Sequence, residues 1–344
     1  MIFWAPFLRF VQQTSAIVAF FTNALLIWLI VNKSPKAMFS YKHIMVFTSV
    51  FEIFYAMIDL LIGPVSSFMG DLEISKKFLE KTLPHFDEVA WGGSFGIALA
   101  SFIVHFMFRY FTLVGNKKLV SGKSFMLYIW LSIPIISGTM YAVLTDIFLQ
   151  ENELMDTLIS TEIESLRYVH KNEMLYYGFS LYATLPNVEI QEINWKHVNG
   201  ISFIGTCITF SFFAMTFFAV KGYSAIKKFN DSNTNSSSLS KALQSQLFNS
   251  LVIQTAIPVI LIHLPSTMIL ICSFMNTTEE VYGHVFTVAV SLFPVIDPLP
   301  SMIIIQPYRR VIKTCFRPGP STQNSSIMRV NPKSPNITSR VVTF

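Results

Sequence analysis

Seven long apolar stretches, separated by loops whose charge alternates in sign, constrain the fold of this chain more than any other feature. The stretches cover residues 10–31, 43–68, 90–114, 126–148, 198–221, 247–273 and 283–306. A helix needs about 20 apolar residues to cross a bilayer, and each stretch is long enough. The runs are continuously apolar rather than alternating, which argues against a transmembrane β-barrel. The sequence therefore predicts an all-α bundle of seven transmembrane helices.

The charges of the loops predict the orientation of this bundle. Loops 32–42 and 115–125 carry three Lys each and no acid, and the tail 307–344 carries seven Lys and Arg and no acid. In contrast, the loop 149–197 carries eight acids against three basic residues. Basic loops stay on the cytoplasmic side because moving Lys and Arg across the membrane is disfavoured. We therefore expect the N-terminus outside and the C-terminus inside.

Composition agrees with a multi-pass membrane protein. Hydrophobic residues make up 52% of the 344 residues and charged residues 13%, where a soluble domain usually has about 25%. The first apolar run is too long for a cleaved signal peptide. We expect one membrane domain over 1–317 and a disordered tail over 318–344, which is rich in Ser, Asn and Pro. No cysteine falls in an outer loop, so we expect no extracellular disulfide.

Three segments outside the apolar runs carry further expectations. The Ser/Asn run Asn230–Ser240 predicts a flexible linker, and Leu239–Asn249 predicts a helix that extends below the sixth span. The segment 307–317 predicts a short amphipathic helix on the inner leaflet. There, Cys315 is a candidate for palmitoylation, although a free thiol is the alternative. Asn276 lies in a glycosylation sequon outside the membrane and very close to it.

Ionisable and amide side chains within the spans form a predicted polar layer. A charged group at bilayer depth costs about 2.5–3.5 kcal/mol on insertion scales, so each needs a partner or a task. At 1.5 Å per residue, Asn23, Glu52, His105 and Asp297 all lie about 12–14 Å from the inner ends of their spans. His105 and Arg109 are four residues apart and share a helix face, so Glu52 could pair with either. The layer either joins helices or acts as a conformational switch.

Prolines interrupt the last two spans. Pro258 and Pro265 lie in the sixth span, and Pro294, Pro298 and Pro300 surround Asp297 in the seventh. Each proline removes a backbone hydrogen bond and permits a kink. The sixth span could swing about Pro258 or Pro265, although kinks also occur in helices that do not move.

Patterns that would indicate other classes of protein are absent from the sequence. The seven His residues are scattered, and HExxH, Gly-x-Ser-x-Gly, P-loop and dinucleotide-binding fingerprints are missing. The chain also lacks the pore loop or charged ring of an ion channel and the internal repeat of a transporter. We expect no enzyme activity, no metal site, no cofactor and no nucleic-acid partner.

Four segments together resemble the class r serpentine chemoreceptors of nematodes, the Str group. The matching segments are Ser40 through Tyr55, His105 through Tyr110, Gln246 through Pro258, and Phe293-Pro294-Val-Ile-Asp297-Pro298-Leu-Pro300 followed by Tyr308-Arg309-Arg310. The resemblance extends over nearly all of 1–317. It implies a G-protein-coupled receptor for small environmental molecules, placed on sensory neurons and their cilia.

The resemblance also implies roles for residues at the inner ends of the spans. Arg109-Tyr110 looks like the counterpart of the Asp-Arg-Tyr ending of rhodopsin-like receptors. Asp297-Pro298 with Tyr308 is similar to their Asn-Pro-x-x-Tyr, with a longer spacing. No acid precedes Arg109, so an adjacent ionic lock is not available. The disulfide of rhodopsin-like receptors is missing, so either packing anchors the loop 149–197 or that loop is mobile.

A ligand would enter from outside between the third, fifth, sixth and seventh spans. Mostly aromatic side chains there suit a small, weakly polar ligand, although the same residues could simply pack the bundle. The candidates are Trp91, Ser94, Phe95, Phe102, Phe203, His263, Thr267, Phe286 and Ser291. Partners would be a heterotrimeric G protein and anionic membrane lipid, both drawn to the basic inner loops. The oligomeric state stays open. The main alternative is a ligand-gated cation channel like the insect olfactory receptors, which have an inside N-terminus.

Overall fold

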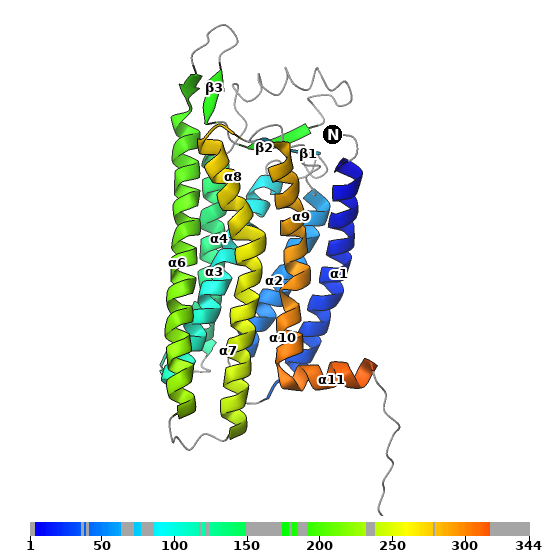
Figure 1. Cartoon of the computed structure of the whole chain (residues 1–344), viewed down its shortest axis with the longest axis vertical. Coiled ribbons are helices and arrows are strands. Elements are labelled where there is room, and N and C mark those ends of the chain that lie inside the picture. The colour runs from blue at the N-terminus through cyan, green and yellow to red at the C-terminus, as the bar shows by residue number, and fades with distance from the viewer. Residues whose placement is uncertain are drawn as a thin grey trace, which may run out of the picture.

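Seven helices that are long and apolar enough to cross a membrane run side by side in the computed structural model (Figure 1). The structure describes residues 4–35, 38, 41–62, 72–76, 86–116, 118–120, 124–148, 174–178, 181–184, 191–231, 238–277 and 279–316. The first five spans are α1 (Trp4–Lys33), α2 (Tyr41–Ile62), α3 (Phe86–Val114), α4 (Ser124–Phe148) and α6 (Trp195–Asp231). The sixth span consists of α7 (Ser238–Pro258), the π-helix η3 (Val259–His263) and α8 (Leu264–Phe274). The seventh consists of α9 (Glu280–Ile296) and α10 (Pro298–Ile304), and α11 (Gln306–Phe316) follows it.

The predicted fold class, an all-α bundle of seven spans, is confirmed, with differences at the boundaries of some spans. The fifth span continues as α6 to Asp231, ten residues beyond the predicted end at 221. The predicted linker Asn230–Ser240 is therefore helical at both ends, and 232–237 lie outside the described residues. The extension is stabilised where Lys241 donates to the Asn230 carbonyl at 3.1 Å. The helix predicted below the sixth span is present, because α7 begins at Ser238.

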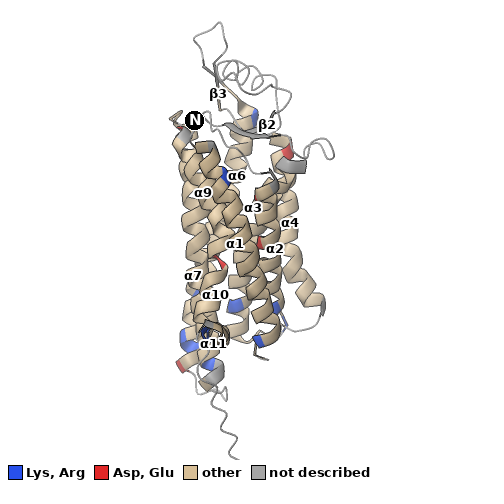
Figure 2. Ribbon diagram, turned by 90° about the vertical axis from the view of Figure 1, so that its right-hand side faces the viewer, with Lys and Arg blue, Asp and Glu red and all other residues tan. Residues whose placement is uncertain are grey.

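The two ends of the bundle differ in charge. Figure 2 shows Lys and Arg gathered at the end where α11 lies, which we call the basic end. This end carries Lys33, Lys227, Lys228, Arg309 and Arg310. The N-terminus lies at the opposite end (Figure 1), as an odd number of spans requires. That the basic end faces the cytoplasm stays a prediction from the charge pattern.

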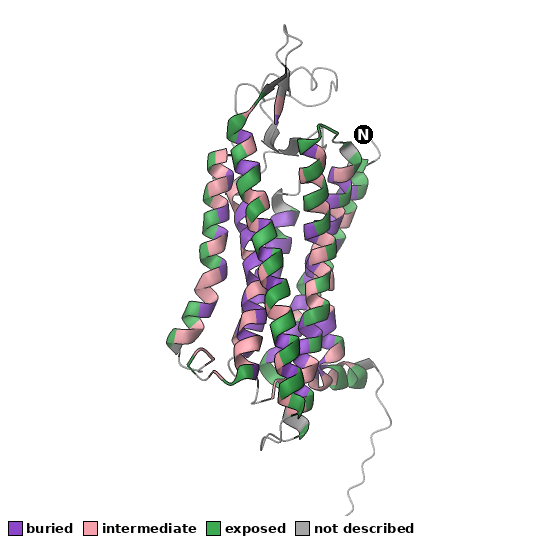
Figure 3. Ribbon diagram, turned by 60° about the vertical axis from the view of Figure 1, so that its left-hand side comes forward, coloured by how far each residue is buried: buried purple, intermediate pink, exposed green. Residues whose placement is uncertain are grey.

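The outward faces of the helices are apolar, as expected for a bundle surrounded by lipid. Exposed and buried positions lie on opposite faces of the helices in Figure 3. Phe10, Phe21, Phe210 and Phe213 are 65–70% exposed and belong to the first and fifth spans. Such side chains are favourable in hydrocarbon, whereas the interior holds the polar groups. The burial pattern thus agrees with the membrane location derived from composition.

The helix α11 crosses the end of the bundle at a steep angle to the spans (Figure 1). Tyr308 is completely buried, and Val311 and Ile312 pack against the core at this end. Arg309 and Arg310 are exposed on the other side. The predicted amphipathic helix after the seventh span is therefore present. The tail beyond 316, predicted to be disordered, lies outside the described residues.

Short strands connect the loops at the end opposite α11. Strand β1 (Leu72–Lys76) pairs antiparallel with β2 (Met174–Gly178), and β3 (Tyr182–Thr184) pairs with β4 (Gln191–Ile193). The Tyr182 hydroxyl donates to the Phe274 carbonyl at the end of α8, 2.8 Å away. The described residues of the loop between the fourth and fifth spans are thus attached to β1 by strand pairing and to the end of α8 by Tyr182.

The spans α3 and α4 approach each other closely because glycines face each other. A Cβ atom on Gly138 would lie against the Ile97 side chain and 2.8 Å from the carbonyl oxygen of Gly93. Backbone cannot retreat from such a contact as a flexible side chain can. Glycine at this position is therefore a steric requirement of the α3–α4 packing.

We expect Gly138→Ala to destabilise the bundle even though alanine favours the helix. Helix propensity alone would stabilise the variant by about 1 kcal/mol, whereas overpacking costs about 1–3 kcal/mol. Gly205→Ala is the matched control, because its new Cβ would meet only Leu270 at 3.7 Å. The melting temperature of each purified protein in detergent measures the difference. Equal melting temperatures for the two variants would contradict the steric argument.

Candidate functional site

A break in the seventh span places the central polar residues. Pro298 has no N–H, so the carbonyl of Pro294 four residues earlier loses its helical partner. Asn23 of α1 replaces that partner, since its Nδ2 donates to the Pro294 oxygen at 3.0 Å and to the Ala19 oxygen at 3.1 Å. Asn23 is completely buried. The first and seventh spans are therefore joined where the proline breaks the helix.

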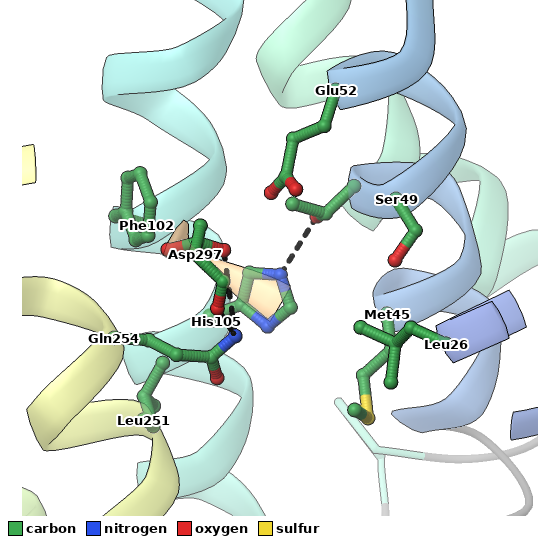
Figure 4. A pocket seen from close by; sticks show the side chains of 10 residues that line it. Leu26, Met45, Ser49, Glu52, Phe102, His105, Leu251, Gln254 and Asp297 are labelled. Carbon is green, nitrogen blue, oxygen red and sulfur yellow. Dashed lines mark hydrogen bonds between the residues drawn. The ribbon is translucent and has the colours of Figure 1, made fainter. Parts of the chain in front are cut away.

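Two carboxyl groups face each other at this level of the bundle. Glu52 of α2 and Asp297, which lies between α9 and α10, are 1% and 2% exposed. Their side chains are close enough to hydrogen-bond when one of them carries a proton, and Asn23 lies against Glu52. Figure 4 shows both carboxyl groups pointing toward a cavity of about 20 Å³, which has room for about one water molecule. Among the described residues, Glu52 Oε2 and Asp297 Oδ1 have no hydrogen-bond partner.

The same level of the bundle is tied to the sixth span. Gln254 of α7 donates from Nε2 to the Asp297 carbonyl at 3.0 Å, and its Oε1 accepts from the Ser301 hydroxyl at 3.1 Å. Ser301 also lies 3.3 Å from the Ser250 hydroxyl. These amide and hydroxyl contacts link α7 to α10 inside the membrane, where few competing polar partners exist.

His105 lines the same cavity and joins the second and third spans. Its Nδ1 lies 2.9 Å from the Tyr41 hydroxyl, and its Nε2 lies 2.8 Å from the Thr48 hydroxyl. Thr48 also donates to the Ile44 carbonyl at 3.2 Å. A single neutral tautomer satisfies this chain: Tyr41 donates to Nδ1, and Nε2 donates to Thr48. The third span is thereby fixed to the second.

Arg109 is buried at the basic end, with 2% of its side chain exposed. Its Nη1 donates to Gln244 Oε1 of α7 at 3.1 Å, and its guanidinium carbon lies 3.4 Å from the centre of the Tyr41 ring. Arg109 Nε and Nη2 have no hydrogen-bond partner among the described residues. The expected pairing of Glu52 with His105 or Arg109 is not observed, because Glu52 points toward Asp297 and Asn23. Because Arg109 is buried inside the bundle, its guanidinium does not extend toward the membrane surface as that of a snorkelling arginine would.

The two tyrosines of the predicted switch have different surroundings. The Tyr308 hydroxyl lies 2.6 Å from the Ser34 hydroxyl, so the first residues of α11 are fixed to the end of the first span. Burial raises the pKa of Tyr308 to about 12, and the Ser34 hydrogen bond partly offsets that rise. Tyr110 packs its ring against Phe218 of α6, 6.0 Å between centroids.

The two prolines of the sixth span border a π-helix. Pro258 ends α7, and Pro265 lies in the first turn of α8. Between them, the Leu264 N–H donates to the Val259 carbonyl five residues back. Single π-turns of this kind are frequent at functional sites. His263, the last residue of the π-helix, is 5% exposed and stands beside Phe212.

Several predicted ligand-binding residues meet in the outer half of the bundle. Trp91 stacks on Phe95 with centroids 6.2 Å apart, and its ring edge contacts Phe286 of α9 at 6.1 Å. Phe102 lies deeper, against Phe293 at 6.0 Å. Ser94 is buried but donates within its own helix, to the Ala90 carbonyl. An aromatic cluster therefore joins the third and seventh spans.

Three other predicted ligand-binding residues are placed differently. Ser291 is buried and donates to Asp59 Oδ2 of α2 at 2.7 Å. Its hydroxyl therefore joins the second and seventh spans. Phe203 and Thr267 are exposed. The structure does not bring these two together with the aromatic cluster, because their positions face outward on α6 and α8. Phe203 and Thr267 are therefore not part of the interior aromatic cluster.

Three residues that connect the site between helices, Tyr41, Gln244 and Gln254, are not among the site residues that the sequence predicts. In the predicted topology Tyr41 lies at the end of the basic loop 32–42, and the two glutamines lie in or beside the sixth span. A long amide side chain near an apolar run is itself a signal, because an unpaired amide is costly in hydrocarbon. That signal could have identified Gln254.

Comparisons with known proteins show the family. The protein-family model described as "Serpentine type 7TM GPCR chemoreceptor Str" matches residues 8–313. The chain belongs to the Str family of serpentine chemoreceptors. The receptor is similar to the Caenorhabditis elegans proteins named G-protein coupled receptor str-217, at 27% identity over 88% of both chains, and Serpentine receptor class r-10, at 25% identity over 95% of this chain and 97% of the relative. It is also similar to G-protein coupled receptor str-33 of the same organism, at 24% identity over 90% of this chain and 92% of the relative.

We expect Asn23→Leu to destabilise the receptor, because the Pro294 carbonyl would be left without a partner. A buried unsatisfied group costs about 1–3 kcal/mol. Pro298→Ala restores an N–H four residues after Pro294, so the double variant Asn23→Leu/Pro298→Ala should recover most of the loss. The melting temperatures of the parent, both single variants and the double variant measure this coupling. Additive losses would show that the Asn23–Pro294 bond does not replace the helical one.

Proposed function

We propose that this Str-family receptor binds a small environmental molecule in the outer half of its bundle and signals to a heterotrimeric G protein at the basic end. The observation that carries the proposal is Arg109, a buried cation at the basic end that is joined to the sixth span through Gln244. Two relatives bear the name G-protein coupled receptor, which supports the same partner here. By family resemblance, the receptor would act in the plasma membrane of a sensory-neuron cilium.

The site offers a physical reason for two conformations. In the present one, Arg109 makes one hydrogen bond to α7, and two of its nitrogen atoms have no partner among the described residues. If the basic ends of α3 and α7 separated, Arg109 could reach acceptors on a partner protein. A partner that offers such acceptors binds the separated state better and shifts the equilibrium toward it. The π-helix and the two prolines give α7 a place to bend.

The ligand site we propose is the aromatic cluster of Trp91, Phe95 and Phe286, together with His263. Ile262, the neighbour of His263, belongs to the same buried cluster as Phe286, against which Trp91 and Phe95 pack. The Nδ1 of His263 donates to the Pro258 carbonyl at 3.3 Å, so Nε2 is an acceptor in the neutral ring. Nε2 is buried without a partner among the described residues. An apolar wall with one buried acceptor suits a small molecule that has a single hydrogen-bond donor.

The central experiment expresses the receptor in cultured cells and records second-messenger responses to a panel of small volatile molecules. We expect a response that requires the G protein. Arg109→Leu should abolish this response while the amount of receptor at the cell surface stays unchanged.

An epitope at the N-terminus should be labelled on intact cells. Ligand-evoked currents that persist without any G protein would favour the cation channel instead. Absence of surface label would overturn the predicted orientation.

His263→Leu should change which molecules activate the receptor. Within the panel, pairs of short-chain alcohols and their methyl ethers separate hydrogen-bond donors from molecules of similar shape. Alcohols that activate the parent should lose about tenfold or more in potency, since a hydrogen bond contributes about 0.5–1.5 kcal/mol and an unpaired group costs more. Ethers should be little affected. Thr267→Val, a change at an exposed position of α8, is the control. Equal losses for alcohols and ethers would argue against hydrogen bonding by Nε2.

A further inference from the structure

The guanidinium of Arg109 lies over the face of an aromatic ring, and its hydrogen-bonded partner is an amide rather than a carboxylate. Its central carbon is 3.4 Å from the centroid of the Tyr41 ring, and both side chains are nearly fully buried, at 2% and 5% exposed. Cation–π contacts contribute most where water is excluded from both partners. Because the second partner of Arg109, Gln244, is neutral, the ring face supplies the main electrostatic compensation that these contacts provide.

Tyr41 is held so that it presents this face to Arg109. Its hydroxyl donates to His105 Nδ1 at 2.9 Å, which fixes the ring at its outer edge. The ring of Phe108 is stacked with it, at 5.8 Å between centroids and an interplanar angle of 29°. His105 is in turn fixed by Thr48 through its Nε2, at 2.8 Å. The bond from Tyr41 to His105, the bond between His105 and Thr48 and the stacking on Phe108 together determine where the ring lies.

We propose that Tyr41 is a positioning residue for the signalling switch: its ring face holds Arg109 in the resting conformation, in the place of an acidic partner. Arg109 is bound between α2 on one side and α7 on the other, through Tyr41 and Gln244. It must leave the ring before it can contact a partner at the basic end. While the ring holds Arg109 in place, Nη1 of Arg109 stays within reach of Gln244 on α7. A weaker ring contact would therefore let the basic ends of α3 and α7 separate more often without a ligand.

Removal of the Tyr41 ring should therefore have a larger effect than removal of its hydroxyl alone. Tyr41→Phe keeps the aromatic face and the stacking, and loses the hydroxyl with its contacts to His105 and Arg109. Tyr41→Leu loses the face. If the hydroxyl mattered more, the two variants would behave alike. If only the filling of space mattered, any other buried ring on α2 would give the same result when replaced by leucine.

The test measures the distance between α3 and α7 directly. Cysteines for spin labels replace Val114 and Ala242, which are exposed at the basic ends of these helices. The native cysteines are removed by Cys207→Ala, Cys272→Ala and Cys315→Ser. Double electron–electron resonance on the full-length receptor in lipid nanodiscs, without ligand or G protein, then gives the populations of near and separated states. The readout does not depend on signalling, so it can fail separately from the proposed function.

We expect Tyr41→Phe to keep the parental ratio of separated to near states within about threefold. Tyr41→Leu should raise that ratio by up to about 30-fold, the value that corresponds to a desolvated cation–π contact. Phe51→Leu, which removes a buried ring elsewhere on α2, is the matched control and should leave the ratio near that of the parent. Tyr41→Met serves as a second variant without a ring if Tyr41→Leu does not purify as a monodisperse protein.

Three results would overturn the proposal. An unchanged ratio in the variants without a ring would show that the ring does not hold Arg109. Equal increases in Tyr41→Phe and Tyr41→Leu would assign the effect to the hydroxyl. An increase in Phe51→Leu as large as that in Tyr41→Leu would assign it to a general loss of packing.

Discussion

The interior of the bundle depends on one hydrogen bond, which Asn23 donates to the carbonyl that Pro298 leaves unpaired. Proline in the middle of a span would normally leave a backbone oxygen exposed to hydrocarbon, at a cost of several kcal/mol. Here α1 supplies the donor, so the break is tolerated only where the first and seventh spans touch. That requirement fixes the rotation of α9 about its axis and, with it, the direction in which Asp297 points.

The position of Asp297 then determines the rest of the polar site. Glu52 meets it from α2, and Gln254 meets its carbonyl from α7. A carboxyl group from α2 and an amide group from α7 therefore converge on Asp297, the residue that ends α9. Polar contacts made between several helices favour a single arrangement of those helices, whereas apolar packing tolerates several. The site is thus both a structural element and a place where two arrangements of the sixth and seventh spans would differ in energy.

The sequence predicts the components of this site better than their contacts. Counting residues from the basic loops brings Asn23, Glu52, His105 and Asp297 to one depth, since rise per residue is nearly constant in a helix. It does not predict which side chains face each other, because that depends on the rotation of each helix. The sequence therefore predicts a partner for Glu52 on the third span, whereas the structure places Asp297 of the seventh span beside it. Phe203 and Thr267 are exposed, although the sequence predicts them in the ligand site, because nothing in an apolar run distinguishes a lipid-facing residue from an interior one.

A signal from the outer half has a short physical route to Arg109. The aromatic cluster and the π-helix both contact α9, and Phe102 touches Phe293 one residue before Pro294. A ligand that moved the sixth span there would act on Gln254 and Gln244 of α7, which bond Asp297 and Arg109. Both glutamines lie on one helix, below the prolines that permit bending. Rotation or tilt of this single helix would therefore break both contacts together. Two bonds broken by one motion give a sharper transition between the two states than either bond would alone.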